Sequence, residues 1–335
     1  MTKLLLTIVD GEKNNAGPKA KEDIISILET EKIKSKKVTM NFRSAWQKIW
    51  YSYVYFPLFF AQNRNSIDTL YFQYPAYSYF MMNRIVSSFK KRIPSAKLFF
   101  IIHDIESLRL ASDDDSKHKE FTLLNQADGL VVHNQKMLDY LTNNGVSTKM
   151  VPLEIFDYLN PAPLNKNRQF KKNVCYAGNL KKSVFLNQLS FDQVMLDVYG
   201  SYPANHYNHG VQYKGIYSPE ELPSHLSESF GLVWDGQSTA TCSGIFGNYL
   251  KYNDPHKISL YLSSGIPVII WKGAALANFI ETNKLGITVN NLSEIDQKLG
   301  ELSAEQYSSI LSNVLHLATK LRQGFYIRTA IKHLN

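Results

Sequence analysis

The sequence is poor in cysteine and has no long apolar run. Its two cysteines, Cys175 and Cys242, are too few for a disulfide framework, which fits a reducing cytosol. No group of Cys and His residues has the spacing of a zinc site. The longest apolar region, 49–60, falls short of the roughly 20 residues that span a bilayer. The N-terminal run at 1–9 is too short for a secretory leader. We therefore expect a cytoplasmic protein without a metal site.

Two recognition motifs are also missing. No GxGxxG follows the first apolar run, which argues against a dinucleotide-dependent oxidoreductase. No nucleic-acid motif is present either, although 37 Lys and Arg residues against 29 Asp and Glu residues give a net charge of +8. That excess favours an anionic partner, and a nucleotide diphosphate or an anionic membrane surface fits it. A basic surface without a specific partner is the alternative.

The sequence does contain a regular alternation of short apolar runs and helical patterns. Apolar runs typical of buried parallel strands form two series. The first series is at 3–9, 69–73, 97–102 and 129–133, and the second is at 173–178, 195–200, 230–234, 267–271 and 286–289. A stretch containing Pro and Asn, 160–168, separates the series and is typical of an interdomain linker. The pattern predicts an α/β fold of two Rossmann-like domains facing a central cleft.

The most specific stretch is NDPHKISLYLSSGIPVIIW at 253–271. Asp254 and Pro255 are typical of the N-cap and first position of a helix, which puts His256 and Lys257 in the first turn. Cations are unfavourable there because the helix dipole is positive at that end. An anion at the same place would resolve the conflict, so the pattern indicates a phosphate site. An exposed, solvated pair is the alternative.

Three other positions in the second half could contact a nucleotide. Gly178 ends a strand before a basic stretch, and main-chain N–H groups at such a turn bind phosphate. Tyr217 precedes a Ser-Pro-Glu-Glu helix start, where its ring could stack on a base. Asp235 follows a buried strand and could bind a sugar hydroxyl. A plain turn, a buried structural tyrosine and a loop cap are the respective alternatives.

In the first half, acids and bases follow a buried strand. The stretch IIHDIESLR places His103, Asp104 and Glu106 beyond strand 97–102, at the end of a parallel sheet that lines ligand sites. A carboxylate or an imidazole there could deprotonate an acceptor hydroxyl. A His-Asp pair that only holds a loop is the alternative. Three residues are predicted at the same rim as acceptor contacts: Asp10, Gly17 and Gln73.

The segment 36–60 mixes cations with aromatic residues of the kind found at membrane interfaces, among them Arg43, Trp46, Lys48 and Trp50. This composition suits a membrane surface or an acceptor lipid. Packing of the same rings in a helical core is the more common explanation. The sequence leaves both interpretations open.

Taken in order, IIHDIESLR, VCYAGNL, YKGIYSPEELP, FGLVWDG, GNYLKYNDPHKISLYLSSGIPVIIW and LGITV resemble a family of bacterial sugar-nucleotide glycosyltransferases. The family includes β-galactofuranosyltransferases of surface polysaccharides and glucosyltransferases that extend GlcNAc on serine-rich adhesins. The similarity covers residues 10–289, and NAGPKAKEDI and NYLKYNDPHK look closer to the galactofuranosyl branch. The resemblance implies a GT-B fold, with domains at 1–160 and 170–315 and a C-terminal helix, 316–335, that crosses back to the first domain.

The resemblance also implies roles for individual residues. The second domain would hold a UDP-sugar through ten residues: Gly178, Asn179, Leu180, Tyr217, Asp235, Asn248, Tyr249, His256, Lys257 and Ser259. Asp104 would be the catalytic base, with His103 and Glu106 behind it. No metal or other cofactor would be needed, because members of this fold generally use none. The pair of spaced glutamates found in many retaining GT-B enzymes is missing from 235–264, which favours inversion.

These observations predict a hexosyltransferase that moves galactofuranose, glucose or a related sugar to a bacterial surface polysaccharide or glycoprotein. The acceptor would be a glycan, lipid-linked or on a glycoprotein, and no nucleic acid would be involved. The enzyme would be cytoplasmic, with peripheral association at the inner face of the cell membrane and a homo-oligomeric state left open. A catalytically silent GT-B subunit that binds a glycan or acts as a chaperone is the alternative.

Overall fold

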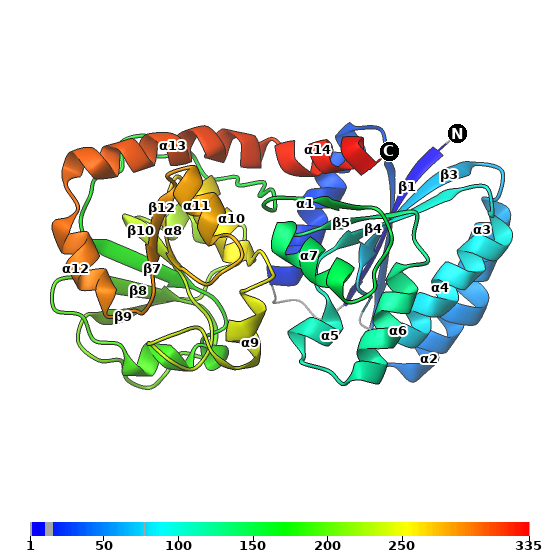
Figure 1. The fold of residues 1–335 in the computed structure, drawn as a ribbon. Helices are drawn as coiled ribbons and strands as arrows, with labels where there is room; N and C mark the ends of the chain where they lie inside the picture. Colours follow the sequence, from blue (N-terminus) through cyan, green and yellow to red (C-terminus); the bar gives the residue numbers. More distant parts are fainter. Residues whose placement is uncertain (1, 11–15, 77, 335) are drawn as a thin grey trace. The chain divides into compact units, whose positions relative to one another are not determined.

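The computed structural model describes residues 2–10, 16–76 and 78–334, the side chains of residues 16 and 17 excepted. Its contacts divide the chain into unit 1, Met1–Glu154 with Ile327–Asn335, and unit 2, Ile155–Tyr326. Both units can be followed in Figure 1. We expected the first domain to extend to residue 160 and the returning helix to start at 316. The contacts instead divide the chain after Glu154, and residues 316–326 belong to unit 2.

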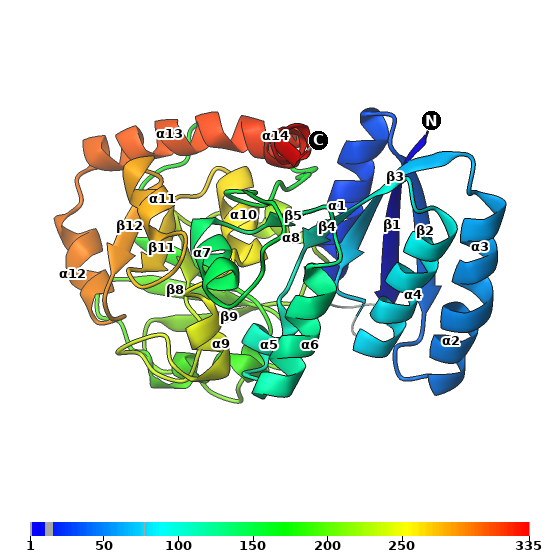
Figure 2. The same cartoon turned by 45° about the vertical axis from the view of Figure 1, so that its right-hand side comes forward.

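Unit 1 is built on a six-stranded sheet in the order β2-β1-β3-β4-β5-β6, and every neighbouring pair is parallel. Its strands are β1 (Thr2–Asp10), β2 (Lys34–Met40), β3 (Ile67–Tyr74), β4 (Lys97–Ile102), β5 (Gly129–Val132) and β6 (Met150–Pro152). Its helices are α1 (Ala16–Thr30), α2 (Ala45–Trp50), η1 (Tyr51–Tyr55), α3 (Phe56–Gln62), α4 (Tyr79–Arg92), α5 (Glu106–Arg109), α6 (Asp114–Leu124) and α7 (Gln135–Asn143). Figure 2 shows α2, α3 and α4 on one side of this unit.

The strands form where the apolar runs predict them, because both faces of the sheet are covered. The side chains of β4 from Leu98 to Ile102 are all buried. The sequence pattern missed β2, whose residues KSKKVTM include three lysines. This strand lies at the sheet edge, where only Val38 and Met40 are buried and lysines protect against edge-to-edge pairing.

Unit 2 repeats the architecture with a parallel sheet in the order β12-β11-β10-β7-β8-β9. Its strands are β7 (Asn173–Ala177), β8 (Met195–Tyr199), β9 (Val211–Gly215), β10 (Phe230–Val233), β11 (Val268–Trp271) and β12 (Gly286–Val289). Its helices are η2 (Leu180–Lys182), η3 (Val184–Gln188), α8 (Leu222–His225), α9 (Gly244–Tyr249), α10 (His256–Ser263), α11 (Ala277–Thr282), α12 (Glu294–Glu301) and α13 (Ala304–Arg322). The two parallel α/β sheets confirm the predicted fold class.

The stretch 160–168 does not behave as a linker. It lies inside unit 2, and both Asn160 and Arg168 are buried. The Arg168 guanidinium donates hydrogen bonds to the carbonyls of Leu226, Glu228 and Ser264. The stretch is therefore an ordered segment packed on unit 2. Its composition alone does not distinguish such a segment from a flexible linker.

The last helix, α14 (Phe325–Leu334), packs on unit 1 from Ile327 onward. Lys149 Nζ donates to the carbonyls of His333 and Leu334 at 2.7 and 3.2 Å. A Cβ added to Gly129 would lie 2.7 Å from Leu334 Cδ1, so the helix touches the start of β5. Among the described residues, no helix combines the length and the apolar character that crossing a membrane requires.

Candidate functional site

The start of α10 holds a largely buried cation in unit 2. The N-cap is Pro255, in an extended conformation, and not Asp254 as the sequence predicted, so His256 and Lys257 are the first two helical residues. Lys257 Nζ lies 2.9 Å from Asp235 Oδ1, 3.1 Å from the Tyr176 hydroxyl and 3.2 Å from the Trp234 carbonyl. It also lies 4.5 Å from the centre of the Tyr176 ring. These groups form what we call the Lys257 cluster.

The Lys257 ammonium remains charged although it is buried. Burial alone would lower the pKa of Lys257, but the Asp235 carboxylate and the Tyr176 hydroxyl together raise that pKa above its ordinary value. Burial raises the pKa of Tyr176 to about 12, which keeps its hydroxyl neutral. The three N–H groups of the ammonium match three acceptors within the protein. The anion that the helix start required is therefore supplied, in this structure, by Asp235.

Asp235 is the part of the Lys257 cluster that a ligand can reach. It follows β10, and 26% of its side chain is exposed, against 12% for Lys257. The Tyr176 hydroxyl lies 3.3 Å from Asp235 Oδ1 and 2.6 Å from Ser183 Oγ. The carboxylate is thus held from the protein side while it remains accessible to solvent.

The turn at Gly178 is closed by internal hydrogen bonds. The Gly178 and Leu180 amides donate to the carbonyls of Tyr199 and Ser201, at 3.1 and 3.0 Å. Asn179 Oδ1 accepts from the Lys181 amide and so caps η2. These donors are not open to a phosphate here, contrary to the expectation of an amide cradle. The close approach needs a glycine opposite, because a Cβ at Gly200 (φ +142°) would lie 1.8 Å from the Gly178 carbonyl oxygen.

Tyr217 already has a stacking partner. Its ring lies 3.7 Å from the ring of His225 at an interplanar angle of 17°. The ring of Tyr199 is 6.2 Å away and tilted. One face of Tyr217 is therefore occupied, and a nucleobase would have to stack on the other.

The remaining predicted donor residues differ in accessibility. Leu180 and Tyr249 are buried, and Ser259 is buried with its hydroxyl donating to the Phe156 carbonyl at 2.7 Å, so these three pack the core. His256 packs against Phe156, with ring centres 5.1 Å apart. Asn248 is exposed on α9. The structure thus gathers Asp235 and Lys257 into one cluster and leaves Asn248 at the surface.

In unit 1, His103 is held by a buried glutamine. His103 Nε2 lies 2.7 Å from Gln73 Oε1, while Gln73 Nε2 donates to Thr7 Oγ1 and to the Lys21 carbonyl. Because the Gln73 amide nitrogen is the donor in both other bonds, its oxygen accepts from His103, and Nε2 carries the imidazole proton. Gln73 is fully buried and orients His103; its surroundings do not fit the predicted contact with an acceptor.

The carboxylates after β4 share one guanidinium. Arg109 Nε lies 3.7 Å from Asp104 Oδ2, and Arg109 Nη2 lies 3.8 Å from Glu106 Oε1. Burial and the nearby Glu120 raise the pKa of Glu106 to about 7, an effect that Arg109 partly offsets. Glu106 therefore titrates near neutral pH, where a general base works best. We call Lys21, Asp104, Glu106, Arg109 and Glu120 the Glu106 cluster.

Two members of the Glu106 cluster were missed by sequence reasoning. Glu120 is buried and accepts from the Tyr74 hydroxyl at 2.6 Å and from the Glu106 and Ser107 amides at 2.9 and 2.8 Å, so it fixes the start of α5. Lys21 is buried and donates to the carbonyls of Ile8 and Pro75. Burial lowers the pKa of Lys21 to about 8, against the opposing effect of Asp104 and Glu106.

The other two predicted acceptor contacts, Asp10 and Gly17, lie on either side of residues 11–15. Asp10 ends β1, and Gly17 lies in the first turn of α1. The intervening residues 11–15 and the surroundings of Gly17 lie outside the described residues. Within the described part of the chain, no group of three or more His, Cys, Asp or Glu side chains is placed to hold a metal ion.

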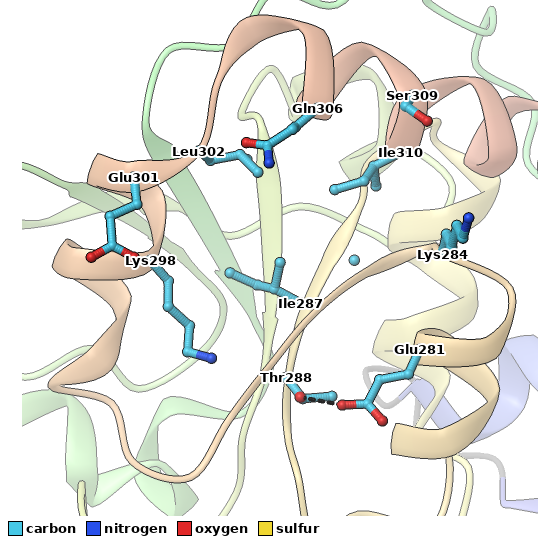
Figure 3. Close-up of a pocket in the computed structure, with 11 residues that line it drawn as sticks. Glu281, Lys284, Ile287, Thr288, Lys298, Glu301, Leu302, Gln306, Ser309 and Ile310 are labelled. Atoms are coloured by element: carbon cyan, nitrogen blue, oxygen red, sulfur yellow. Dashed lines mark hydrogen bonds between the residues drawn. The ribbon is translucent and has the colours of Figure 1, made fainter.

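A hollow of about 590 Å³ lies elsewhere on unit 2. It runs along the edge strand β12 and is lined by Glu281, Thr288 and Lys298, among others, beneath α12 and α13 (Figure 3). None of the predicted donor residues lines it. The large hollow and the Lys257 cluster are therefore separate features of unit 2.

The two parallel α/β units match the architecture of glycosyltransferases of the GT-B class. Models of the glucosyltransferase 3-like N-terminal and C-terminal domains match residues 2–155 and 174–334. This protein belongs to the glucosyltransferase 3-like family, which confirms the family suggested by the motifs.

Two relatives show the range of the family. The chain is 33% identical to the β-1,6-galactofuranosyltransferase WbbI of Escherichia coli (strain K12), over 80% of this chain and 79% of that protein. It is 27% identical to glucosyltransferase 3 of Streptococcus parasanguinis, over 78% and 76%. The sequence is thus similar to transferases of two different sugars.

Solved structures agree on the fold alone. The pneumococcal O-GlcNAc transferase GtfA, in complex with UDP and GlcNAc, aligns with a TM-score of 0.60 at 11% identity, over 99% of this chain and 98% of that one. Sucrose-phosphate synthase from Thermosynechococcus elongatus aligns with a TM-score of 0.56 at 12% identity, over 96% and 99%. These alignments confirm the predicted GT-B fold.

Proposed function

We propose that this enzyme transfers a hexose from a UDP-sugar to a saccharide acceptor of a bacterial surface polysaccharide or glycoprotein. The relatives support galactofuranose and glucose as donor sugars, and the higher identity to WbbI favours galactofuranose. The observation that carries the proposal is the Lys257 cluster, because it fixes a largely buried, charged ammonium at a helix N-terminus beside a more accessible carboxylate.

The Lys257 cluster suggests how the donor is held. A sugar hydroxyl that donates to Asp235 would weaken the hold of this carboxylate on Lys257. The released N–H could then bind the diphosphate, together with the positive end of the α10 dipole. As the glycosidic bond breaks, negative charge grows on the UDP leaving group, and these two fixed positive charges would stabilise it. This arrangement supports a transfer that needs no metal.

The Glu106 cluster suggests how the acceptor is activated. The sequence predicts Asp104 as the catalytic base. Glu106 is better suited to that role, because burial is the main cause that raises its pKa to about 7, close to neutral pH. We assign proton removal from the acceptor hydroxyl to Glu106, with Asp104 and Arg109 fixing its charge environment. Direct attack by that hydroxyl on the anomeric carbon would invert the configuration.

Donor exchange tests this function. UDP release is measured with UDP-galactofuranose and UDP-glucose, each with octyl glucoside and octyl N-acetylglucosaminide as acceptors. Acceptor-dependent release with one donor is expected, together with a rise in melting temperature when UDP is added. If neither donor yields UDP and UDP leaves the melting temperature unchanged, the proposal is wrong. Unaltered turnover after removal of all divalent ions with EDTA would support the metal-independent route.

We also propose that the enzyme works in the cytoplasm, at the inner face of the cell membrane, on a lipid-linked or glycoprotein acceptor. The catalytically silent subunit considered above is not favoured, since the similar proteins named here are transferases.

A further inference from the structure

One face of a helical run in unit 1 is apolar yet exposed. The backbone stays helical through α2, η1 and α3, from residue 45 to residue 62. Its inner face contributes Phe56 and Phe60, both fully buried. Its outer face forms what we call the aromatic stripe: Trp46, Ile49, Trp50, Tyr53, Val54 and Leu58. Trp46 is 72% exposed and Leu58 56% exposed.

This helical run differs from α7, another surface helix of unit 1. In α7, the exposed positions are Gln135, Lys136, Asp139, Thr142 and Asn143, which are all polar. The exposed positions of the stripe recur every three to four residues, so they form one continuous apolar surface. Exposed apolar surfaces of this kind mark interaction sites. A helix that is apolar on both faces therefore needs a second partner besides its own core.

The charge of the sequence segment that contains the stripe indicates the kind of partner. Residues 32–103 contain twelve of the 37 Lys and Arg residues but only one of the 29 Asp and Glu residues. The rest of the chain has 25 basic and 28 acidic residues, so the whole positive excess of the protein is in this segment. No acidic residue occurs from residue 32 to residue 67, which includes the entire helical run. The partner should be strongly anionic.

Cations are also positioned directly against the rings. The Arg84 guanidinium carbon lies 4.9 Å from the centre of the ring of Tyr53, a member of the stripe, and 5.9 Å from the centre of the Phe80 ring. Lys36 Nζ lies 5.8 Å from the Tyr55 ring. Phe80, which is 43% exposed, extends the apolar surface onto α4. Aromatic rings flanked by cations are typical of segments that lie at the interface of a bilayer, where the rings enter the headgroup region and the cations bind anionic lipids.

We propose that the aromatic stripe docks on the surface of an anionic lipid bilayer, with the helical run 45–62 lying in the plane of the interface. A hollow of about 310 Å³ among Trp46, Gln47, Trp50 and Tyr51 gives a lipid group a place to enter the stripe. The apolar side chains supply burial, and the basic residues of 32–103 supply attraction to the negative surface. The docking does not depend on which sugar the enzyme transfers.

Sedimentation with vesicles tests the proposal on the full-length protein. Binding is expected to vesicles of phosphatidylcholine with about a third phosphatidylglycerol and to fall sharply with phosphatidylcholine alone. Raising the salt to about 1 M should release most of the protein. The double substitution Trp46→Gln/Leu58→Gln should lower the partition coefficient by about tenfold or more. Lys48→Gln and Arg64→Gln should each lower it by about fivefold.

Matched substitutions on unit 2 serve as controls. Met195 is an apolar residue with 46% exposure, and Lys166 is an exposed cation. Met195→Gln and Lys166→Gln should leave vesicle binding unchanged. Losses equal to those of the stripe variants would contradict the proposal, as would absence of binding to either vesicle composition.

Tryptophan emission provides a direct reading of depth. Of the four tryptophans, Trp46 and Trp50 are in the stripe, whereas Trp234 and Trp271 belong to unit 2. Brominated lipids should quench the emission of the wild-type protein, and Trp46→Phe/Trp50→Phe should abolish that quenching. Quenching that persists in this variant would place the contact elsewhere and overturn the proposal.

A protein partner or a second copy of the chain is the competing explanation. In that case Trp46→Gln/Leu58→Gln would change the mass measured by light scattering and leave vesicle binding intact, which would overturn membrane docking. Release of UDP with a soluble glycoside acceptor should be unchanged in the stripe variants. Failure of the docking and failure of the proposed transfer are therefore distinguished by separate measurements.

Discussion

Lys21 of unit 1 and Lys257 of unit 2 are both largely shielded from solvent, and their pKa values shift in opposite directions. In unit 2, Lys257 contacts the Asp235 carboxylate at 2.9 Å, and its pKa is raised above the ordinary value despite burial. In unit 1, Lys21 contacts two main-chain carbonyls, and burial lowers its pKa to about 8 although acids are nearby. The Asp235 carboxylate and the Tyr176 hydroxyl outweigh the loss of solvation at Lys257, whereas at Lys21 the loss of solvation outweighs the attraction of Asp104 and Glu106.

The largest expected effect is on kcat when Glu106, whose pKa is about 7, is replaced. Glu106→Gln should lower kcat by about 10²–10⁴-fold, because the acceptor loses its base, with a smaller change in the KM of the donor. The wild-type kcat/KM should rise with pH around a pKa of about 7. Steady-state kinetics across pH check both. If Asp104→Asn has the larger effect on kcat and Glu106→Gln is nearly silent, Asp104 is the base.

Lys257→Met removes the positive charge of the Lys257 cluster in unit 2. It should lower kcat/KM for the UDP-sugar by about 10²–10³-fold, since a preorganised charge beside the leaving group is lost. It should also weaken the stabilisation by UDP in a thermal shift. Lys251→Met, at an exposed lysine on the preceding loop, is the control and should change neither value. Equal losses in both variants would mean that only overall charge matters.

Lys21 and Lys257 should have opposite effects on how the free energy of unfolding depends on pH. The folded-state pKa of Lys21 is about 8, below its ordinary 10.5, so the unfolded chain binds more protons between these values. Stability should therefore rise with pH in this window, by about 3 kcal/mol in total. The difference in unfolding free energy between wild type and Lys21→Met isolates this rise. The raised pKa of Lys257 has the opposite sign: its contribution is present at lower pH and is lost as pH increases above 10.5.

The smallest effect is expected at a predicted site residue that the structure places in the core. Ser259→Ala should cost about 1–2 kcal/mol of unfolding free energy, because the Phe156 carbonyl loses its donor. Transfer kinetics should stay within about twofold of wild type. A loss of donor affinity much beyond the change in stability would return Ser259 to the binding site.

The helix start at 253–271 shows how far the sequence could be interpreted. The conflict between two cations and a positive helix end was real and pointed to an anion. In the structure, the anion at this helix start is the Asp235 carboxylate. Asp235 lies 22 positions before Lys257 in the sequence, and the fold brings the two side chains into contact. Local spacing carries no information on such a contact.

The first unit shows a signal that could have been used. Lys21 occupies the same face of α1 as Ile24 and Leu28, both buried, so a charged residue on an apolar stripe indicated a buried cation. Glu120 offered no such signal, because it lies among charged residues in DDSKHKE and resembles an exposed helix face. The apolar strands and the family could be predicted because their signals are local or ordered along the chain.

The return of α14 to unit 1 means that this unit is not a continuous stretch of chain. A fragment that stops at Glu154 would leave uncovered the surface against which Ile327, Ile331 and Leu334 are buried. Such a fragment should aggregate when it is produced alone. A circular permutant that joins residues 325–334 ahead of β1 through a flexible connector would restore the missing cover, and would allow the first unit to be studied in isolation.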